Sequence, residues 1–239
     1  MKTACFIPIK QNSERVPGKN FRPVGGIPLY QAIVTKALAS GCFSTVFVDT
    51  NSPEAAEFAR AHGAVPIERK PELALASANG NDLLNHHAAL EPSFDFYFQL
   101  FVTAPLLKIE SIRGAVSALL ESATHDSVFT TNEHKGFFWR SGLPISYQPN
   151  LLPRSQDLVP IVEETTALYG ITRAALLNYR CRIGARPHFF PVSRIESVDL
   201  NTEDDFVYLD WLVTTGRAEL LPATVDRTKL VAFTPACAA

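Results

Sequence analysis

The sequence has few cysteines and almost no excess of charge of either sign. No two of its four cysteines form a CxxC pair, so neither a disulfide framework nor a zinc knuckle is expected; they are Cys5, Cys42, Cys181 and Cys237. The 22 basic and 24 acidic residues give a formal net charge of −2. This balance supplies no basic stripe for a polyanion, so nucleic acid is not expected as a partner.

Long apolar runs are also missing. No stretch approaches the roughly 20 residues that a membrane-spanning helix needs, and the first apolar segment contains Pro8 and Lys10, which makes it too short for a secretion signal. We therefore expect no membrane contact and a soluble protein of the cytoplasm. The length of 239 residues suits one α/β domain over positions 1–239.

Apolar strand-like runs alternate with amphipathic helical runs, which is βαβ order. The pattern predicts strands at 3–9, 46–49, 64–67, 94–103, 166–171 and 188–191, and helices at 29–40, 52–62, 82–90, 109–121, 173–179 and 203–215. Three crossovers predict a mostly parallel, Rossmann-like sheet with helices on both faces. At about 132–165 the pattern dissolves into Gly, Pro, aromatic and polar residues, which indicates an inserted arm.

The loop after the first strand is the most informative segment, because ligands of open α/β sheets bind beyond the carboxyl ends of strands. It carries Lys10, Arg15 and Lys19, and Gly18 lets backbone amides approach an anion. A triphosphate fits this composition. The spacing of a P-loop and the GxGxxG pattern are both absent, and a solvated basic loop is the alternative interpretation.

Six segments together resemble one enzyme family. Positions 7–20, IPIKQNSERVPGKN, resemble the signature loop of the acylneuraminate and 3-deoxy-manno-octulosonate cytidylyltransferases, which activate acidic keto sugars as CMP conjugates. Five more follow in family order: FVDTNS at 47–52, RKPELA at 69–74, TAPL at 103–106, RSQDL at 154–158 and SVDLNTEDDF at 197–206. The resemblance implies a fold of the nucleotide-diphospho-sugar transferase type. It also implies an enzyme that joins the CMP part of CTP to a small acidic acceptor, foremost a 3-deoxy keto sugar acid, and releases pyrophosphate.

The same resemblance suggests roles for individual residues. Four are expected to contact or orient the CTP phosphates as catalytic residues, with Lys19 facing solvent beside them: Lys10, Arg15, Lys19 and Asn20. Lys10 departs from an arginine that is common in the family, so a point charge replaces a bidentate contact. Four more are expected to bind the nucleotide: Pro8, Ile9, Arg69 and Asn79.

The acidic motif near the C-terminus predicts a Mg²⁺ site. Asp199 and Asn201 stand two residues apart on an extended segment, so their side chains point the same way. An asparagine can supply a carbonyl oxygen but no negative charge, so Mg²⁺ should bind more weakly here unless CTP supplies most ligands. Asp204 and Asp205 are expected to begin the following helix, where acidic residues complement the helix dipole.

An acidic acceptor needs a cationic or polar partner, and the resemblance points to Gln99 on a strand and to Arg154 and Gln156 on the arm. In the family the arm crosses to a second subunit, and the aromatic run at 137–139 is a physical reason to expect a homodimer. The acceptor pocket and base choice are expected to differ from the family, because Phe101 replaces a glutamine and Ala76 an aspartate.

Two neighbouring histidines, His86 and His87, fall within a helical pattern and are expected on the helix surface or in packing. Three other functions remain open. The same fold serves glycosyltransferases, although no DxD-type motif follows the middle strand. The departures at Lys10, Phe101 and Asn201 would also fit a nucleotide-binding protein that has lost catalysis. A non-sugar acid such as a phosphonate is a further possible CMP acceptor.

Overall fold

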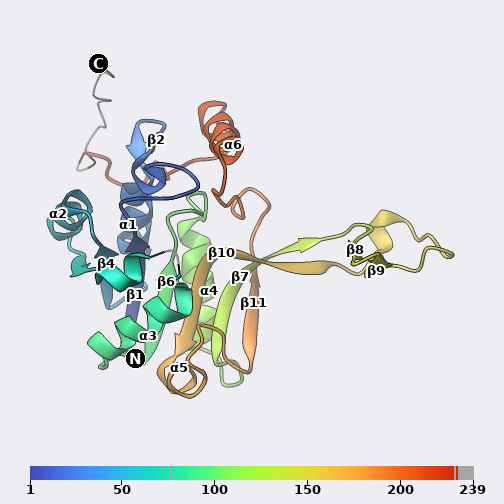
Figure 1. Ribbon diagram of the computed structural model, residues 1–239, viewed down its shortest axis with the longest axis horizontal. Coiled ribbons are helices and arrows are strands. Elements are labelled where there is room, and N and C mark those ends of the chain that lie inside the picture. Colours follow the sequence, from blue (N-terminus) through green and yellow to red (C-terminus); the bar gives the residue numbers. More distant parts are fainter. Residues whose placement is uncertain (76, 229, 231–239) are drawn as a thin grey trace.

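The computed structural model describes residues 1–75, 77–228 and 230, so Ala76 and Cys237 lie outside the described residues (Figure 1). Its centre is a seven-stranded sheet in the order β11-β7-β10-β6-β1-β4-β5. The strands are β1 (Thr3–Ile9), β4 (Thr45–Thr50), β5 (Val65–Glu68), β6 (Phe96–Leu100), β7 (Ser127–His134), β10 (Ile161–Thr172) and β11 (Pro187–Pro191). Only β10 runs antiparallel to its sheet neighbours. The predicted mostly parallel sheet is confirmed.

Helices cover both faces of this sheet (Figure 1). Side chains of β1 alternate, so that Cys5 and Ile7 join one hydrophobic core and Phe6 joins the other. Residues of α1 (Leu29–Ser40), α2 (Pro53–Ala61) and α4 (Ile109–Leu120) fill the first core, and those of α3 (Gly80–Leu90) and α5 (Arg173–Tyr179) fill the second. Burial on both faces explains why β1 reads as an unbroken apolar run.

Helix starts follow the capping residues in the sequence. The Ser52 hydroxyl accepts a hydrogen bond from Ala55 N at 3.3 Å and begins α2. Thr202 and Asp205 form a capping box at the start of α6 (Glu203–Thr214), so the expected helix-start position of Asp204 and Asp205 is confirmed.

The strand β7 is an element of the main sheet that the sequence pattern missed. Its sequence SVFTTNEH reads as polar, yet Ser127, Thr130, Thr131 and Asn132 are buried. Hydrogen bonds satisfy them, as between the Thr165 and Thr130 hydroxyls at 2.7 Å. The arm expected at about 132–165 begins within β7 and ends within β10, and the strand predicted at 166–171 begins earlier, at 161.

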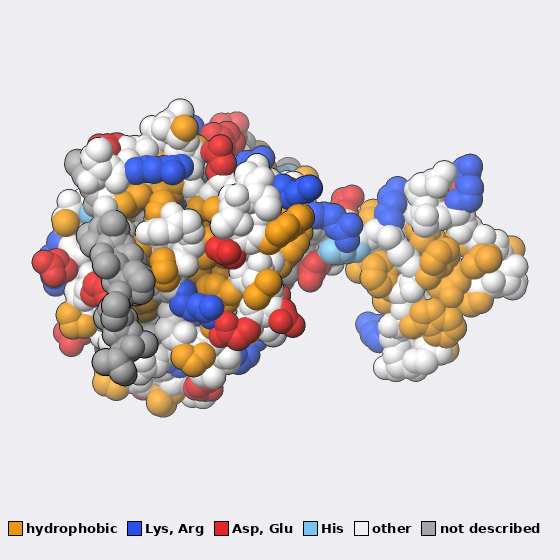
Figure 2. All heavy atoms as spheres, turned by 90° about the horizontal axis from the view of Figure 1, so that it is seen from above, with side chains coloured by type: hydrophobic (Ala, Val, Ile, Leu, Met, Phe, Trp, Pro, Cys, Tyr) orange, Lys and Arg blue, Asp and Glu red, His pale blue; other side chains and the backbone are white. Residues whose placement is uncertain are grey.

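The arm is a long excursion between β7 and β10 that projects from the body (Figure 1). In its stem, residues 161–164 of β10 pair with residues 131–134 of β7. A shift in the pairing register between Glu164 and Tyr169 separates this stem from the main sheet. Its tip holds β8 (Trp139–Arg140), β9 (Leu143–Pro144) and the 3-10 helix η3 (Ser155–Asp157). Figure 2 shows hydrophobic side chains gathered there. None of the described helices could cross a membrane.

Candidate nucleotide site

A pocket of about 410 Å³ opens where β1 and β6 end. The loop after β1 and the 3-10 helix η1 (Lys19–Phe21) form one wall, and residues 101–103 after β6 form another. Six residues that the sequence analysis selected line it: Pro8, Lys10, Arg15, Lys19, Asn20 and Arg69. The pocket therefore lies at the carboxyl edge of the parallel strands, where open α/β sheets bind ligands.

The loop after β1 is held in place by hydrogen bonds to its surroundings. Gln11 N donates to Asn51 Oδ1 at 2.9 Å, and Asn20 Nδ2 donates to Lys10 O at 2.9 Å. Gly18 adopts a φ of 63°, a left-handed conformation that glycine enters without strain. In the described part of the chain, the ion-pair partner of Lys10 Nζ is the exposed Glu14, whose Oε1 lies 3.9 Å away. The charge of Lys10 is therefore available to a ligand.

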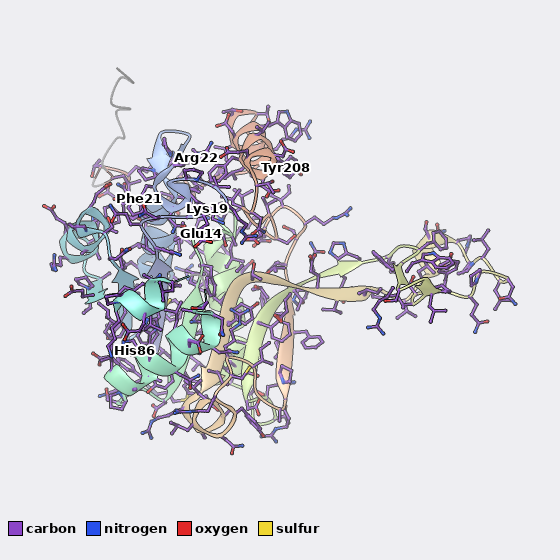
Figure 3. All side chains as sticks on the ribbon, in the orientation of Figure 1. Glu14, Lys19, Phe21, Arg22, His86 and Tyr208 are labelled. Carbon is purple, nitrogen blue, oxygen red and sulfur yellow. The ribbon has the colours of Figure 1, made fainter. Side chains whose placement is uncertain are left out.

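Lys19 is placed differently from the expectation that it faces solvent. Its side chain is buried, with 7% of the residue exposed, and Nζ donates to Leu200 O at 2.6 Å. Burial and the nearby Arg15 lower the pKa of Lys19, while Asp199 and Asp205 oppose the shift. Lys19 and Glu14 line the same pocket and are labelled in the body of the molecule in Figure 3. Lys19 thus joins the basic loop to the acidic segment at 199–205.

The acidic segment carries one buried oxygen that suits a cation. Asn201 Nδ2 donates to Asp199 Oδ2 at 2.5 Å, whereas Asp199 Oδ1 is buried and has no hydrogen-bond partner among the described residues. A carboxylate oxygen of this kind fits Mg²⁺, which prefers oxygen ligands. Asn201 turns its NH₂ group toward Asp199, so in this arrangement it orients the carboxylate.

Arg69 belongs to a buried polar network under the pocket. Its Nε and Nη2 donate to the Asp49 carboxylate, with Nη2 at 2.8 Å from Oδ2. His87 Nε2 lies 3.0 Å from the same oxygen. Burial pushes the pKa of Asp49 up, but the hydrogen bonds from His87 and Arg69 outweigh it and hold the pKa below its usual value. The network fixes the Arg69 guanidinium at the pocket wall.

The other predicted site residues are not at the pocket wall. Ile9 is fully buried in the core, and Asn79 caps α3 through its side chain. Gln99 is buried beside α3, where its Nε2 donates to Gly80 O at 2.9 Å. Arg154 and Gln156 are exposed on the arm, with Arg154 Nε donating to Asp157 Oδ2 at 2.7 Å. The arm that carries Arg154 and Gln156 projects away from the body of its own chain (Figure 1).

Sequence reasoning did not assign the buried partners of Arg69. Asp49 lies in the FVDTNS segment and was given no role, while His87 was expected on the surface or in packing. The packing alternative is confirmed, because His87 is fully buried and stacks on Phe6 with ring centroids 4.5 Å apart. An aspartate at the end of an otherwise apolar strand was the available signal, since a buried carboxylate requires a partner.

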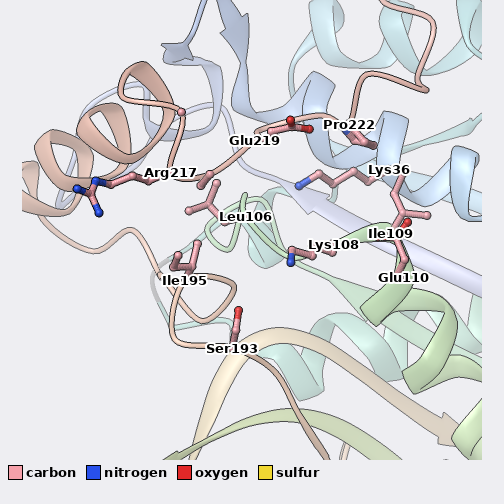
Figure 4. Close-up of a pocket in the computed structure, with 12 residues that line it drawn as sticks. Lys36, Leu106, Lys108, Ile109, Glu110, Ser193, Ile195, Arg217, Glu219 and Pro222 are labelled. Carbon is pink, nitrogen blue, oxygen red and sulfur yellow. The ribbon is translucent and has the colours of Figure 1, made fainter.

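A second pocket, of about 450 Å³, is lined by residues 106–110 at the start of α4, by Lys36 of α1 and by the segment after α6 (Figure 4). Lys36 reaches into it from α1 and is almost fully buried, and its Nζ donates to Pro105 O at 2.5 Å and Leu107 O at 2.9 Å. Burial lowers the pKa of Lys36 to about 7, against the opposing effect of Glu196 and Glu110. These two hydrogen bonds hold in place the turn that follows residues 101–103.

Comparison with known proteins gives concordant results. A family model described as cytidylyltransferase matches residues 4–139. The CMP-N,N'-diacetyllegionaminic acid synthase of Legionella pneumophila is 30% identical over 92% of this chain and 97% of its own length. The N-acylneuraminate cytidylyltransferase of Streptococcus agalactiae is 27% identical over 87% of this chain but 52% of its own length, so the chain spans about half of that relative.

The fold has a counterpart among solved structures. A CMP:2-keto-3-deoxy-manno-octonic acid synthetase, solved in complex with CTP, superposes with a TM-score of 0.68 at 17% identity and covers 90% of this chain and 100% of its own. At this identity the likeness concerns the fold alone. It agrees with the α/β nucleotidyltransferase architecture that the sequence predicted.

Proposed function

The chain belongs to the cytidylyltransferase family, and we propose on this basis that it transfers CMP from CTP to a small acidic acceptor. An acceptor oxygen, which is a hydroxyl oxygen of a sugar acid or an oxygen of a phosphonate, attacks the α-phosphorus and forms a new P–O bond. The bond from that phosphorus to the bridging oxygen of the β-phosphate breaks, and pyrophosphate leaves with the electron pair. When the attacking oxygen is a hydroxyl, its proton passes to solvent. No covalent intermediate with the protein is needed.

The observation that carries this proposal is the meeting of Lys10, Arg15 and Lys19 at one pocket beyond β1. Negative charge grows on the phosphoryl oxygens and on the departing pyrophosphate, and fixed cations stabilise such a transition state. Asn20 orients this loop through its bond to Lys10 O. Arg69, held by Asp49, faces the same pocket and is a candidate contact for the nucleoside.

Mg²⁺ is the proposed cofactor, and Asp199 Oδ1 is the oxygen that would hold it. When bound, Mg²⁺ would neutralise charge on the phosphates. Asn201 would keep the Asp199 carboxylate turned toward the site through its hydrogen bond to Oδ2. Lys19 Nζ donates a hydrogen bond to the carbonyl of Leu200, the residue after Asp199. The phosphate-binding lysine is therefore held next to the proposed metal-binding segment.

We further propose a homodimer in which the arm of one copy reaches the other, so that Arg154 and Gln156 approach the partner's acceptor. The exposed hydrophobic side chains at the arm tip support association; they include Phe137, Trp139, Leu143, Leu151 and Leu152. The acceptor is proposed to be an acidic sugar, because relatives are named for N-acylneuraminate and N,N'-diacetyllegionaminic acid. Use of CTP would place the reaction in the cytoplasm.

The test is pyrophosphate release with Mg²⁺, each of the four nucleoside triphosphates in turn, and a panel of acids. The panel holds N-acetylneuraminate, 3-deoxy-manno-octulosonate and phosphonoacetate. We expect release only with CTP, and only when an acid is present. A double variant, Lys10→Ala with Arg15→Ala, serves as the inactive control. Release without an acceptor, or equal release from all four nucleotides, would overturn the proposal.

A further inference from the structure

Arg182 stands at the edge of the nucleotide pocket on the segment between α5 and β11. Its guanidinium carbon lies 3.6 Å from the centroid of the Tyr169 ring and 5.7 Å from that of Phe101. Phe101 also lines the nucleotide pocket. Phe101 is therefore shared by the nucleotide pocket and the surroundings of the Arg182 guanidinium.

The position of Arg182 is fixed, but its charge is poorly neutralised. Arg182 N donates to Asn81 Oδ1 at 2.9 Å, and the aromatic face of Tyr169 holds the guanidinium flat. Its acidic neighbour, Glu164, approaches only to 4.0 Å, and the same Glu164 oxygen accepts the Tyr169 hydroxyl at 3.1 Å. A planar, pre-oriented guanidinium of this kind suits a carboxylate or a phosphonate.

Gln99 presents a buried acceptor to the same region. Its Nε2 donates to Gly80 O, and because a carbonyl can only accept, this bond fixes the orientation of the amide. Gln99 Oε1 is then left buried without a hydrogen-bond partner in the part of the chain that the structure describes. A buried oxygen left unpaired is costly, and a ligand hydroxyl or N–H would satisfy it.

Gly80 shows that the two groups face one space. A Cβ atom placed on Gly80 would lie 2.6 Å from Arg182 Nη1 and 3.6 Å from Gln99 Oε1. The absence of a side chain at position 80 therefore makes room for the guanidinium over the first turn of α3. Alanine there would displace the end of the Arg182 side chain from this position and leave the backbone undisturbed, since alanine is a good helix former.

We propose that Arg182 and Gln99 form a subsite for the acceptor of the transferred CMP. The guanidinium of Arg182 binds an anionic group of the acceptor, a carboxylate or a phosphonate, and Gln99 Oε1 accepts a hydrogen bond from acceptors that carry a hydroxyl or an amide. This inference rests on the proposed function, because it assigns the acid that the reaction consumes. Unlike Arg154 on the arm, Arg182 lies beside the pocket of its own chain.

The test measures binding of three acids to the full chain saturated with CMP, which cannot react. Calorimetric titrations use N-acetylneuraminate, 3-deoxy-manno-octulosonate and phosphonoacetate. We expect at least one to bind the wild type, and Arg182→Met to weaken that binding about ten- to a hundred-fold, the usual range for a lost charged hydrogen bond. The acid affinity of Arg182→Lys should lie between those of the wild type and Arg182→Met. Gly80→Ala should weaken acid binding without loss of fold. CMP binding should stay within two-fold in all variants.

Arg186→Met is the matched control, because Arg186 is an exposed arginine on the same segment. Equal acid binding by Arg182→Met and wild type would overturn the subsite, and so would a wild type that binds none of the three acids. Pyrophosphate release separates this inference from the proposed function. Wild-type release with an unchanged acceptor KM in Arg182→Met would reject the subsite alone. Arg182-dependent acid binding without any release would reject the proposed function alone.

Discussion

His87 Nε2 lies 3.0 Å from Asp49 Oδ2 beneath α3, and the same carboxylate oxygen accepts a hydrogen bond from Arg69 Nη2. All three side chains are buried. The arrangement ties β4, the loop after β5 and the helix α3 to a single carboxylate. It also holds a guanidinium at the wall of the nucleotide pocket, so the stability of the fold and the shape of the site depend on one buried group.

Asp49→Asn is therefore predicted to destabilise the protein strongly. It leaves Arg69 as a buried cation without its counter-ion, which typically costs about 3–5 kcal/mol of unfolding free energy. Urea denaturation measures the change. Asp210→Asn, at an exposed position on α6, should alter the same quantity by less than about 0.5 kcal/mol. If the two variants were equally stable, the ion pair would not be a stabilising element.

Lys19→Ala is predicted to lower both turnover and stability. Loss of a cation beside the transition state costs about 10²–10³ in rate, and leaving the Leu200 carbonyl without its donor costs about 1–3 kcal/mol of unfolding free energy. Lys10→Ala, at a more exposed lysine, should reduce turnover while the unfolding free energy stays nearly unchanged. Turnover of Lys19→Ala within a factor of two of wild type would remove Lys19 from the phosphate site.

Asn201→Asp is predicted to reduce the Mg²⁺ concentration for half-maximal activity several-fold. The substitution places a second carboxylate against Asp199, where Asn201 now donates at 2.5 Å. At an effective dielectric of about 20, a unit charge about 4 Å from the metal contributes roughly 4 kcal/mol before desolvation reduces it. Without Mg²⁺ the two carboxylates repel, so the variant should melt at a lower temperature in a chelator. An unchanged Mg²⁺ requirement would place residue 201 away from the metal.

The arm is predicted to form the dimer contact. Leu143, with 68% of its surface exposed, should become buried between two copies, so Leu143→Glu should shift the protein toward monomer at micromolar concentration. Light scattering reports the mass. Leu177→Glu, at an exposed leucine of α5, is the matched control and should leave the mass unchanged. A monomeric wild type would contradict the prediction directly.

Because Lys36 is buried, we predict that the free energy of unfolding depends on pH. The folded pKa of Lys36, about 7, lies below the ordinary value of 10.5, so between these values the unfolded chain holds a proton that the folded chain lacks. Stability therefore rises with pH through this window, by up to about 1.4 kcal/mol per pH unit. Lys36→Met should flatten the rise between pH 7.5 and 9 in urea denaturation. An equally steep rise in the variant would show that Lys36 stays charged when folded.

Much of this fold could be predicted from the local pattern of apolar and polar residues in the sequence. The helices at 29–40 and 173–179 were predicted at their observed bounds, because amphipathic spacing and turn residues mark such elements directly. The strand β7 was missed because its buried threonines and Asn132 satisfy their hydrogen bonds only through distant residues, such as Ser197 for Asn132. Periodicity carries no information about such partners.

The sequence by itself determined the α/β class, the family and the basic loop after β1, because these depend on residues that are near one another along the chain. Tertiary structure decided how the side chains of the site are placed and which of the predicted residues lie away from the pocket. It turned Lys19 inward to Leu200, placed Gln99 and Arg182 over Gly80, and joined His87 to an aspartate 38 positions away. Burial and orientation depend on contacts between distant segments, and those contacts exist only once the sheet has brought the segments together.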